Sequence, residues 1–309
     1  MNKKDTRIVF MGTPDIARQC LSQLICDGYN IVGVFTREDK PVGRKQVMTP
    51  PPVKLVAQEH DIPVFQPKNL KGSRKDDLSA LAPDMIVVVA YGRILPKEII
   101  DMPALGCLNL HVSLLPKYRG AAPIQWAIIN GEKCTGVSVM KIDEGLDTGD
   151  VIDVLPIDID ENETRPQLFE KVAEKGKEFL SHVVGRVIEG DFTLTPQDHE
   201  KATLAPPLKK EMADFDFNAD ARTLHNKIRG QFPWPGAQFT YGDKAVKVLE
   251  SRLSKDSGAP GQILSTKPLT VACADGALEL VTVQPRGSKA MDGTAWCAGR
   301  RLKKGDFLQ

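Results

Sequence analysis

The residues best suited to chemistry lie in the segment 106–116, which reads Gly-Cys-Leu-Asn-Leu-His-Val-Ser-Leu-Leu-Pro. Its apolar residues alternate with Asn109, His111 and Ser113, and this period of two sends the polar side chains to one face of a strand. Polar groups are costly to bury without partners, so three of them on one face indicate the wall of a pocket. In open α/β sheets, ligands bind beyond the carboxyl ends of the strands.

A second polar segment, 143–150, carries four carboxylates and two glycines between two apolar runs. Either segment alone also fits a purely structural role, because Asp and Gly are ordinary turn residues and a single histidine is commonly a hydrogen-bonded core residue. The two segments together are more specific than either one.

The two segments resemble the formyltransferases that use 10-formyltetrahydrofolate. The resemblance rests on Asn109-x-His111, on the runs 113–116 and 118–123, and on Gly145-Leu-Asp-Thr-Gly149. It implies that Asn109, His111 and Asp147 form the catalytic centre. It further implies that a short segment contacts the folate, and the residues of this segment are Ser113, Leu114, Leu115 and Pro116.

The order of elements predicts an α/β fold. Strands and helices alternate up to about residue 189, which predicts a doubly wound, mainly parallel, Rossmann-like sheet. The strand 7–12 ends in a single glycine, so the Gly-x-Gly-x-x-Gly pattern of dinucleotide-binding proteins is lacking and NAD is disfavoured. A helix over 219–228 and about five short β runs between 238 and 283 then predict a small OB-like β-barrel.

These patterns predict two domains. We expect a formyltransferase catalytic domain over 1–189, a linker rich in proline over 190–207, and an OB-like tRNA-binding domain over 208–309. Each part is long enough to bury a core of its own.

Composition narrows the class of protein. Hydrophobic residues make up 41% of the chain and charged residues 26%, as in ordinary globular proteins, and no apolar run is long enough to cross a bilayer. We therefore expect a cytoplasmic protein that does not bind membranes, and a monomer. The six cysteines form no Cys-x-x-Cys pair or Cys/His cluster, so neither a metal site nor a disulfide framework is expected.

The connection over 37–52 is longer and more charged than an ordinary strand-to-helix turn. Its basic residues could bind phosphates, and the resemblance implies that an insertion here, with Arg44, reaches the acceptor end of a tRNA. Residues 200–309 hold 17 Lys and Arg against 12 Asp and Glu, a modest surplus that is weak evidence for nucleic acid by itself. The predicted tRNA contacts are Arg44, Lys45, Lys209, Lys210 and Arg229.

The resemblance implies formyl transfer from 10-formyltetrahydrofolate, used as a co-substrate without a metal, to the α-amino group of initiator methionyl-tRNA. Asn109 would donate to the oxyanion of the tetrahedral intermediate. Asp147 would either stabilise a protonated His111 or accept the proton of the amine, and the sequence leaves both roles open. The alternative acceptor is an amino-sugar nucleotide. A third reading is an RNA-binding protein with an idle α/β domain, but the retained centre argues against it.

Overall fold

The computed structural model describes residues 2–43, 45–70 and 73–308, with no side-chain detail for 73–75. The chain divides into two compact units. Unit 1 comprises residues 1–120, 136–157 and 170–204, and unit 2 comprises residues 121–135, 158–169 and 205–309. The division after residue 204 falls inside the segment that we expected to be a linker.

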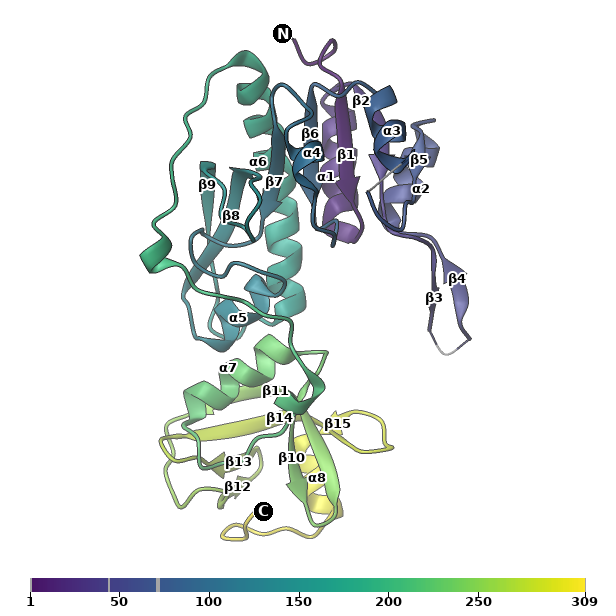
Figure 1. Cartoon of the computed structure of the whole chain (residues 1–309). Helices are drawn as coiled ribbons and strands as arrows, with labels where there is room; N and C mark the ends of the chain where they lie inside the picture. The colour runs from purple at the N-terminus through teal and green to yellow at the C-terminus, as the bar shows by residue number, and fades with distance from the viewer. Residues whose placement is uncertain (1, 44, 71–72, 309) are drawn as a thin grey trace. The chain divides into compact units, whose positions relative to one another are not determined.

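Unit 1 is built on a seven-stranded sheet with the strand order β5-β2-β1-β6-β7-β8-β9 (Figure 1). Its strands are β1 (Ile8–Gly12), β2 (Ile31–Phe35), β5 (Val64–Phe65), β6 (Met85–Val89), β7 (Cys107–His111), β8 (Cys134–Lys141) and β9 (Val151–Asp158). The pairs from β5 to β7 are parallel, whereas β7 and β8 are antiparallel. The predicted, mainly parallel Rossmann-like domain is therefore confirmed.

Four helices lie between these strands in the chain: α1 (Asp15–Cys26), α2 (Pro52–Glu59), α3 (Ser73–Ala80) and α4 (Lys97–Ile100). A fifth, α6 (Arg165–Glu189), follows β9, and its residues from 170 onward belong to unit 1. Gly12 lets α1 follow β1 closely, since a Cβ at this position would lie 2.6 Å from the Cβ of Ala17. At Gly176, α6 packs against Leu110 of β7 and Val137 of β8. The sequence did not predict α3 or α4, because α3 is strongly polar and α4 is a single turn.

The connection expected to be a long loop instead forms a two-stranded antiparallel ribbon, β3 (Lys40–Val42) and β4 (Val47–Thr49). Figure 1 shows the ribbon extending away from the sheet of unit 1. Gly43, with φ +72°, starts the turn between its strands. All six ribbon residues are exposed, including Val42, Val47 and Met48. Pairing satisfies the backbone of the ribbon while both of its faces stay open to solvent.

Unit 2 contains an antiparallel sheet with the strand order β10-β11-β14-β13-β12, and β15 pairs with β14. Its strands are β10 (Ala237–Tyr241), β11 (Lys244–Ser254), β12 (Ile263–Thr266), β13 (Leu269–Ala272), β14 (Ala277–Pro285) and β15 (Met291–Asp292). Its helices are α5 (Pro123–Ile129), α7 (Ala221–Gln231) and α8 (Gly293–Gly299). The five predicted β runs are thus present in an antiparallel β domain, whereas α8, a short helix without an apolar period, was not predicted.

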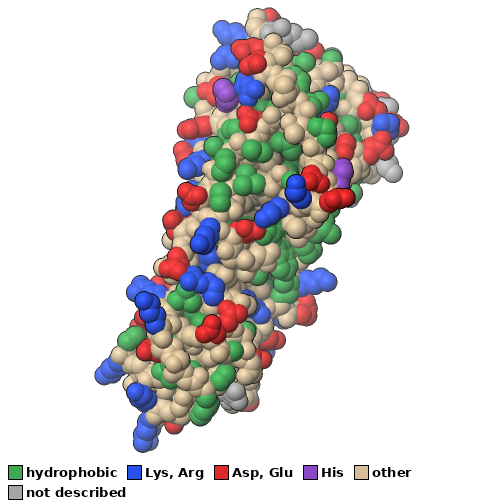
Figure 2. All heavy atoms as spheres, turned by 90° about the vertical axis from the view of Figure 1, so that its left-hand side faces the viewer, with side chains coloured by type: hydrophobic (Ala, Val, Ile, Leu, Met, Phe, Trp, Pro, Cys, Tyr) green, Lys and Arg blue, Asp and Glu red, His purple; other side chains and the backbone are tan. Residues whose placement is uncertain are grey.

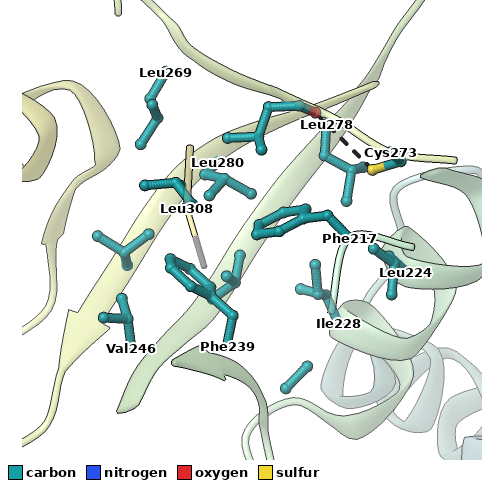
Figure 3. Packing of buried hydrophobic residues seen from close by; sticks show 14 of the residues in the cluster. Phe217, Leu224, Ile228, Phe239, Val246, Leu269, Cys273, Leu278, Leu280 and Leu308 are labelled. Carbon is teal, nitrogen blue, oxygen red and sulfur yellow. Dashed lines mark hydrogen bonds between the residues drawn. The ribbon is translucent and has the colours of Figure 1, made fainter. Parts of the chain in front are cut away.

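Aromatic side chains fill the core of unit 2. The Phe239 ring lies 5.4 Å from that of Phe217 and packs edge-on against Trp296 at 5.9 Å between ring centroids. Figure 3 shows Phe217 and Phe239 among leucines of the sheet, next to Leu224 and Ile228 of α7. Burying such a cluster is the main favourable contribution to the folding of this unit.

Candidate active site

Asn109 and His111 lie on β7, which pairs with β6 on one side and β8 on the other. Asn109 stands opposite Val88 and Met140 in the two pairings. Because alternate residues of a strand share a face, both polar side chains project from the same side of the sheet. His111 is buried and Asn109 is half-buried. Among the described residues, none forms a hydrogen bond with the Asn109 amide.

The loop between β8 and β9 carries Asp147. The Asp143 carboxylate holds the loop, accepting from the Gly145 N–H at 3.0 Å and from Oγ1 of Thr148 at 2.7 Å. Gly149 passes so close to the carbonyl oxygen of Lys141 that a Cβ there would overlap it. Asp147 itself has φ +52°, in the left-handed region that a non-glycine residue rarely adopts. The turn chemistry of this loop therefore sets its local shape around Asp147.

The structure brings His111 and Asp147 together. Nδ1 of His111 lies 3.6 Å from Oδ2 of Asp147, and the two side chains are 7% and 16% exposed. Nε2 of His111 is 2.9 Å from the carbonyl oxygen of Tyr118, and the N–H of Gly120 donates to Oδ2 of Asp147 at 2.8 Å. A carbonyl only accepts, so Nε2 carries a proton and Nδ1, which faces the carboxylate, is the nitrogen that can gain or lose one.

The segment after β7 forms a tight turn. The Ser113 hydroxyl is buried and donates to the carbonyl oxygen of Lys117 at 2.7 Å, and the Ser113 carbonyl accepts from the Ser138 hydroxyl at 2.7 Å. The Ser138 hydroxyl also accepts from the Leu115 N–H. Ser113 is thus engaged inside the turn, while Leu114, Leu115 and Pro116 are only partly buried. The folate contacts expected for these residues remain a prediction.

A hollow of about 570 Å³ lies beside the Asp147 loop in unit 1. Residues 142–145 of the loop form one side, and Ile100 of α4 and Gly106 before β7 contribute to the other. Its volume lies within the range of small-molecule sites, roughly 300–1,000 Å³. Among the described residues, no group of three or more His, Cys, Asp or Glu side chains is arranged to hold a metal ion.

The predicted tRNA contacts fall into different settings. Lys45 at the ribbon and Lys209 and Lys210 in unit 2 are exposed, whereas Arg44 lies outside the described residues. Arg229 is buried: its guanidinium donates to the Asn226 side chain at 2.9 Å and to the Glu163 carbonyl oxygen at 3.0 Å, and burial lowers its pKa. This guanidinium therefore links parts of unit 2 to one another.

Sequence reasoning missed several residues around the centre. Tyr118 and Gly120 act through their backbone, and Arg119 and Gln197 are buried next to the Asp147 loop. Residues 118–120 belong to a sequence motif, but a motif does not show which backbone groups form these contacts. Gln197 lies in the segment expected to be a linker, where no periodicity marked it.

Comparisons with known proteins show the family and the fold of the chain. Residues 6–184 match the family model described as "Formyl transferase", and residues 207–301 match "Formyl transferase, C-terminal domain". A sugar N-formyltransferase, WlaRD, shares the fold with TM-score 0.69 and 19% identity over 92% of this chain and 99% of that one. The HypX protein from Aquifex aeolicus aligns with TM-score 0.64 and 18% identity over 97% of this chain and 48% of its own.

The fold and the site therefore define a formyl transferase. The chain is 44% identical to the methionyl-tRNA formyltransferase of Clostridioides difficile (strain 630), over 98% of this chain and 99% of that protein. It is 42% identical to that of Bacillus subtilis (strain 168), over 98% of both chains. The chain belongs to the methionyl-tRNA formyltransferase family. Within the ranges 2–43, 45–70 and 73–308, no helix has the length and apolarity needed to cross a membrane.

Proposed function

We propose that this chain transfers the formyl group of 10-formyltetrahydrofolate to the α-amino group of initiator methionyl-tRNA, giving N-formylmethionyl-tRNA for translation initiation. The observation that carries the proposal is His111 beside Asp147, with Asn109 on the same strand face, in a chain 44% identical to a methionyl-tRNA formyltransferase over nearly its whole length. A cytosolic location goes with this function and is part of the proposal.

The reaction makes three demands on the site. The amine must attack the formyl carbon, an oxyanion must be stabilised, and the departing folate nitrogen must receive a proton. The Asn109 amide suits the oxyanion, because it has no other partner among the described residues and its N–H groups are free to donate. Nδ1 of His111 and the Asp147 carboxylate are the groups that can take the proton of the amine, and the two atoms lie 3.6 Å apart, beside each other in the site.

The hollow beside the Asp147 loop supports a folate-derived donor. It is bordered by loop residues 142–145, so a ring system held there would lie next to the segment that carries Asp147. Ile100 and Ile142 give its lining an apolar part that suits a flat ring, but five charged residues also line it, and Asn109, His111 and Asp147 are not among its lining residues. The partly buried residues Leu114, Leu115 and Pro116 are further proposed contacts to the donor, as the family resemblance implies.

The ribbon and the exposed lysines support a tRNA acceptor. The ribbon presents Lys40 and Lys45 together with exposed Val47 and Met48, a combination that suits a phosphate backbone and unstacked bases. Lys209 and Lys210 of unit 2 are also proposed phosphate contacts. On the face drawn in Figure 2, Lys and Arg side chains project around unit 2 with Asp and Glu between them. Buried Arg229 is left out of this surface.

The acceptor is tested by incubating the protein with 10-formyltetrahydrofolate labelled in the formyl group. One reaction receives charged initiator tRNA and a second receives dTDP-linked amino sugars. We expect label only on the methionyl group of the tRNA. Label on the amino sugar with none on the tRNA would establish the alternative function. Label on neither acceptor would refute the proposed formyl transfer.

The role of the 37–52 connection in tRNA binding is tested separately with Arg44→Ala. Loss of a phosphate contact should raise KM for the charged tRNA about 10-fold and leave KM for the folate donor unchanged, and the tRNA effect should shrink at high salt. Lys4→Ala, an exposed basic residue at the start of unit 1, is the matched control. Unchanged kinetics of Arg44→Ala on tRNA would remove the ribbon from acceptor binding.

A further inference from the structure

Arg119 and Gln197 form a buried pair next to the Asp147 loop in unit 1. Oε1 of Gln197 accepts from Nε of Arg119 at 3.1 Å and from Nη2 at 2.7 Å. Nε2 of Gln197 donates to the carbonyl oxygens of Asp147 at 2.9 Å and Gly149 at 2.7 Å. Arg119 is 6% exposed and Gln197 is 8% exposed, so water competes little for these bonds.

The pair can be built in only one orientation. A guanidinium has donors and no acceptor, so the oxygen of the Gln197 amide must face Arg119. The NH2 group then faces the loop, where two carbonyl oxygens receive both of its hydrogens. Hydrogen bonds from a charged donor are stronger than neutral ones, so Arg119 fixes the amide and the amide fixes the backbone on both sides of Thr148.

Arg119 also lies between the two residues that orient the reacting side chains. The carbonyl of Tyr118 accepts from Nε2 of His111, and the N–H of Gly120 donates to the Asp147 carboxylate. The backbone N–H of Arg119 donates in turn to the carbonyl oxygen of Thr203 at 2.8 Å. The segment carrying Gln197 and Thr203 thus holds the Asp147 loop and the 118–120 segment in fixed positions relative to each other.

We propose that Gln197 and Arg119 are positioning residues for formyl transfer, acting through Asp147. The pair fixes the position of the Asp147 loop relative to β7, so that the carboxylate lies beside His111 at the point where the amine attacks. Displacements of about 1 Å at a reacting group can cost roughly 100-fold in rate, so a clamp of this kind matters for catalysis more than for folding. The inference rests on the function proposed above.

The kinetic test is a double-mutant cycle of Gln197→Ala and Asp147→Asn, read as the single-turnover rate of formyl transfer. We expect Gln197→Ala to lower the rate about 10- to 100-fold in the wild-type background. In the Asp147→Asn background, the same change should cost less than about 3-fold, because the group that it positions is already disabled. If Gln197→Ala lowered the rate by the same factor in both backgrounds, the inference would be overturned. A general structural defect would act in this way, because its effect does not depend on Asp147.

Arg119→Lys and Gln231→Ala are tested beside this cycle, the first as a conservative variant and the second as a control. Lys keeps the charge and can reach one acceptor, so Arg119→Lys should retain more activity than Arg119→Ala, and Arg119→Ala should add little to Gln197→Ala. Gln231 is a matched control, a buried glutamine of unit 2 whose Nε2 donates to the Met212 carbonyl oxygen at 3.2 Å. Gln231→Ala should lower stability and leave the single-turnover rate unchanged.

Hydrogen exchange tests the clamp without any assay of activity. In the full chain, Gln197→Ala should raise exchange at the Gly120 amide and in residues 143–150 at least 10-fold, while exchange in unit 2 stays unchanged. Gln231→Ala should leave exchange in 143–150 unchanged. A wild-type chain without formyl transfer would refute the proposed function alone, whereas unchanged loop exchange in Gln197→Ala would refute the clamp.

Discussion

Oδ2 of Asp147 lies 3.6 Å from Nδ1 of His111 and accepts the backbone N–H of Gly120 at 2.8 Å. The second distance is that of a good hydrogen bond, and the first is longer than one. The backbone therefore holds both side chains, the carboxylate through the Gly120 N–H and the imidazole through the Tyr118 carbonyl on Nε2, and Nδ1 makes no hydrogen bond of ordinary length to Asp147. A substitution that keeps an acceptor for the Gly120 N–H can therefore remove the charge of Asp147 without moving its side chain.

Asp147→Asn should remove the charge while keeping the contact with Gly120, because an amide oxygen can accept the same N–H. We expect kcat for formyl transfer to fall about 10²- to 10⁴-fold, the usual range for loss of a positioned acid or base. The thermal midpoint should change by little more than 1 °C, on the order of a few tenths of a kcal/mol. A large fall in the midpoint would mean that the variant reports on loop stability instead.

Asn109→Ala removes the amide that we assign to the oxyanion. Loss of one such donor costs roughly 10²- to 10³-fold in kcat in comparable sites. Since the amide has no hydrogen-bond partner among the described residues, its removal should leave the fold and KM for the folate donor nearly unchanged. Steady-state kinetics and circular dichroism check both points, and undiminished turnover would refute the assignment.

His225 should make the folded chain sensitive to acid. Its Nε2 lies 3.1 Å from the carbonyl oxygen of Glu161 and its Nδ1 lies 3.0 Å from the Ser251 hydroxyl, and burial lowers its pKa from the ordinary value of 6.5. The unfolded chain then binds the proton more readily than the folded chain. The stabilising contribution is complete above pH 6.5 and is lost as the pH falls below that value through the folded pKa.

Urea unfolding between pH 8 and pH 5 measures this effect. His225→Gln should have a flatter profile below pH 6.5, where one titrating group changes the free energy of unfolding by at most about 1.4 kcal/mol per pH unit. His182→Gln, on the exposed face of α6, is the control and should keep the wild-type slope. Parallel profiles for wild type and His225→Gln would contradict the prediction.

Cys107 should be chemically inert although it lies two residues before Asn109. Burial raises the pKa of its thiol to about 12, and its Sγ lies 3.6 Å from the carbonyl oxygen of Ile99. The thiolate, which is the reactive form, is then scarce at neutral pH. Iodoacetamide at pH 8 should modify exposed Cys26 and spare Cys107, as peptide mass spectrometry would show. Alkylation of Cys107 at the rate of Cys26 would contradict this, and denatured protein, in which every thiol reacts, is the control.

Local patterns in the sequence determined much of this protein. The alternation over 107–113 predicts β7 with Asn109 and His111 on one face, and the glycines and carboxylates of 143–150 predict the turn that carries Asp147. The α/β order of elements and the five β runs of unit 2 also follow from short-range periodicity. Such features depend on neighbouring residues, which is why they can be read without coordinates.

Tertiary structure alone decided what those residues touch. Arg229, predicted as a phosphate contact in a basic tail, is buried and donates to the Glu163 carbonyl oxygen, and Gln197, in a segment without periodicity, holds the loop of Asp147. The ribbon over 40–49 replaced an expected loop because its two strands pair with each other. Contacts between residues some 50 to 80 positions apart depend on how the whole chain packs, and no local pattern of charge or hydrophobicity encodes them.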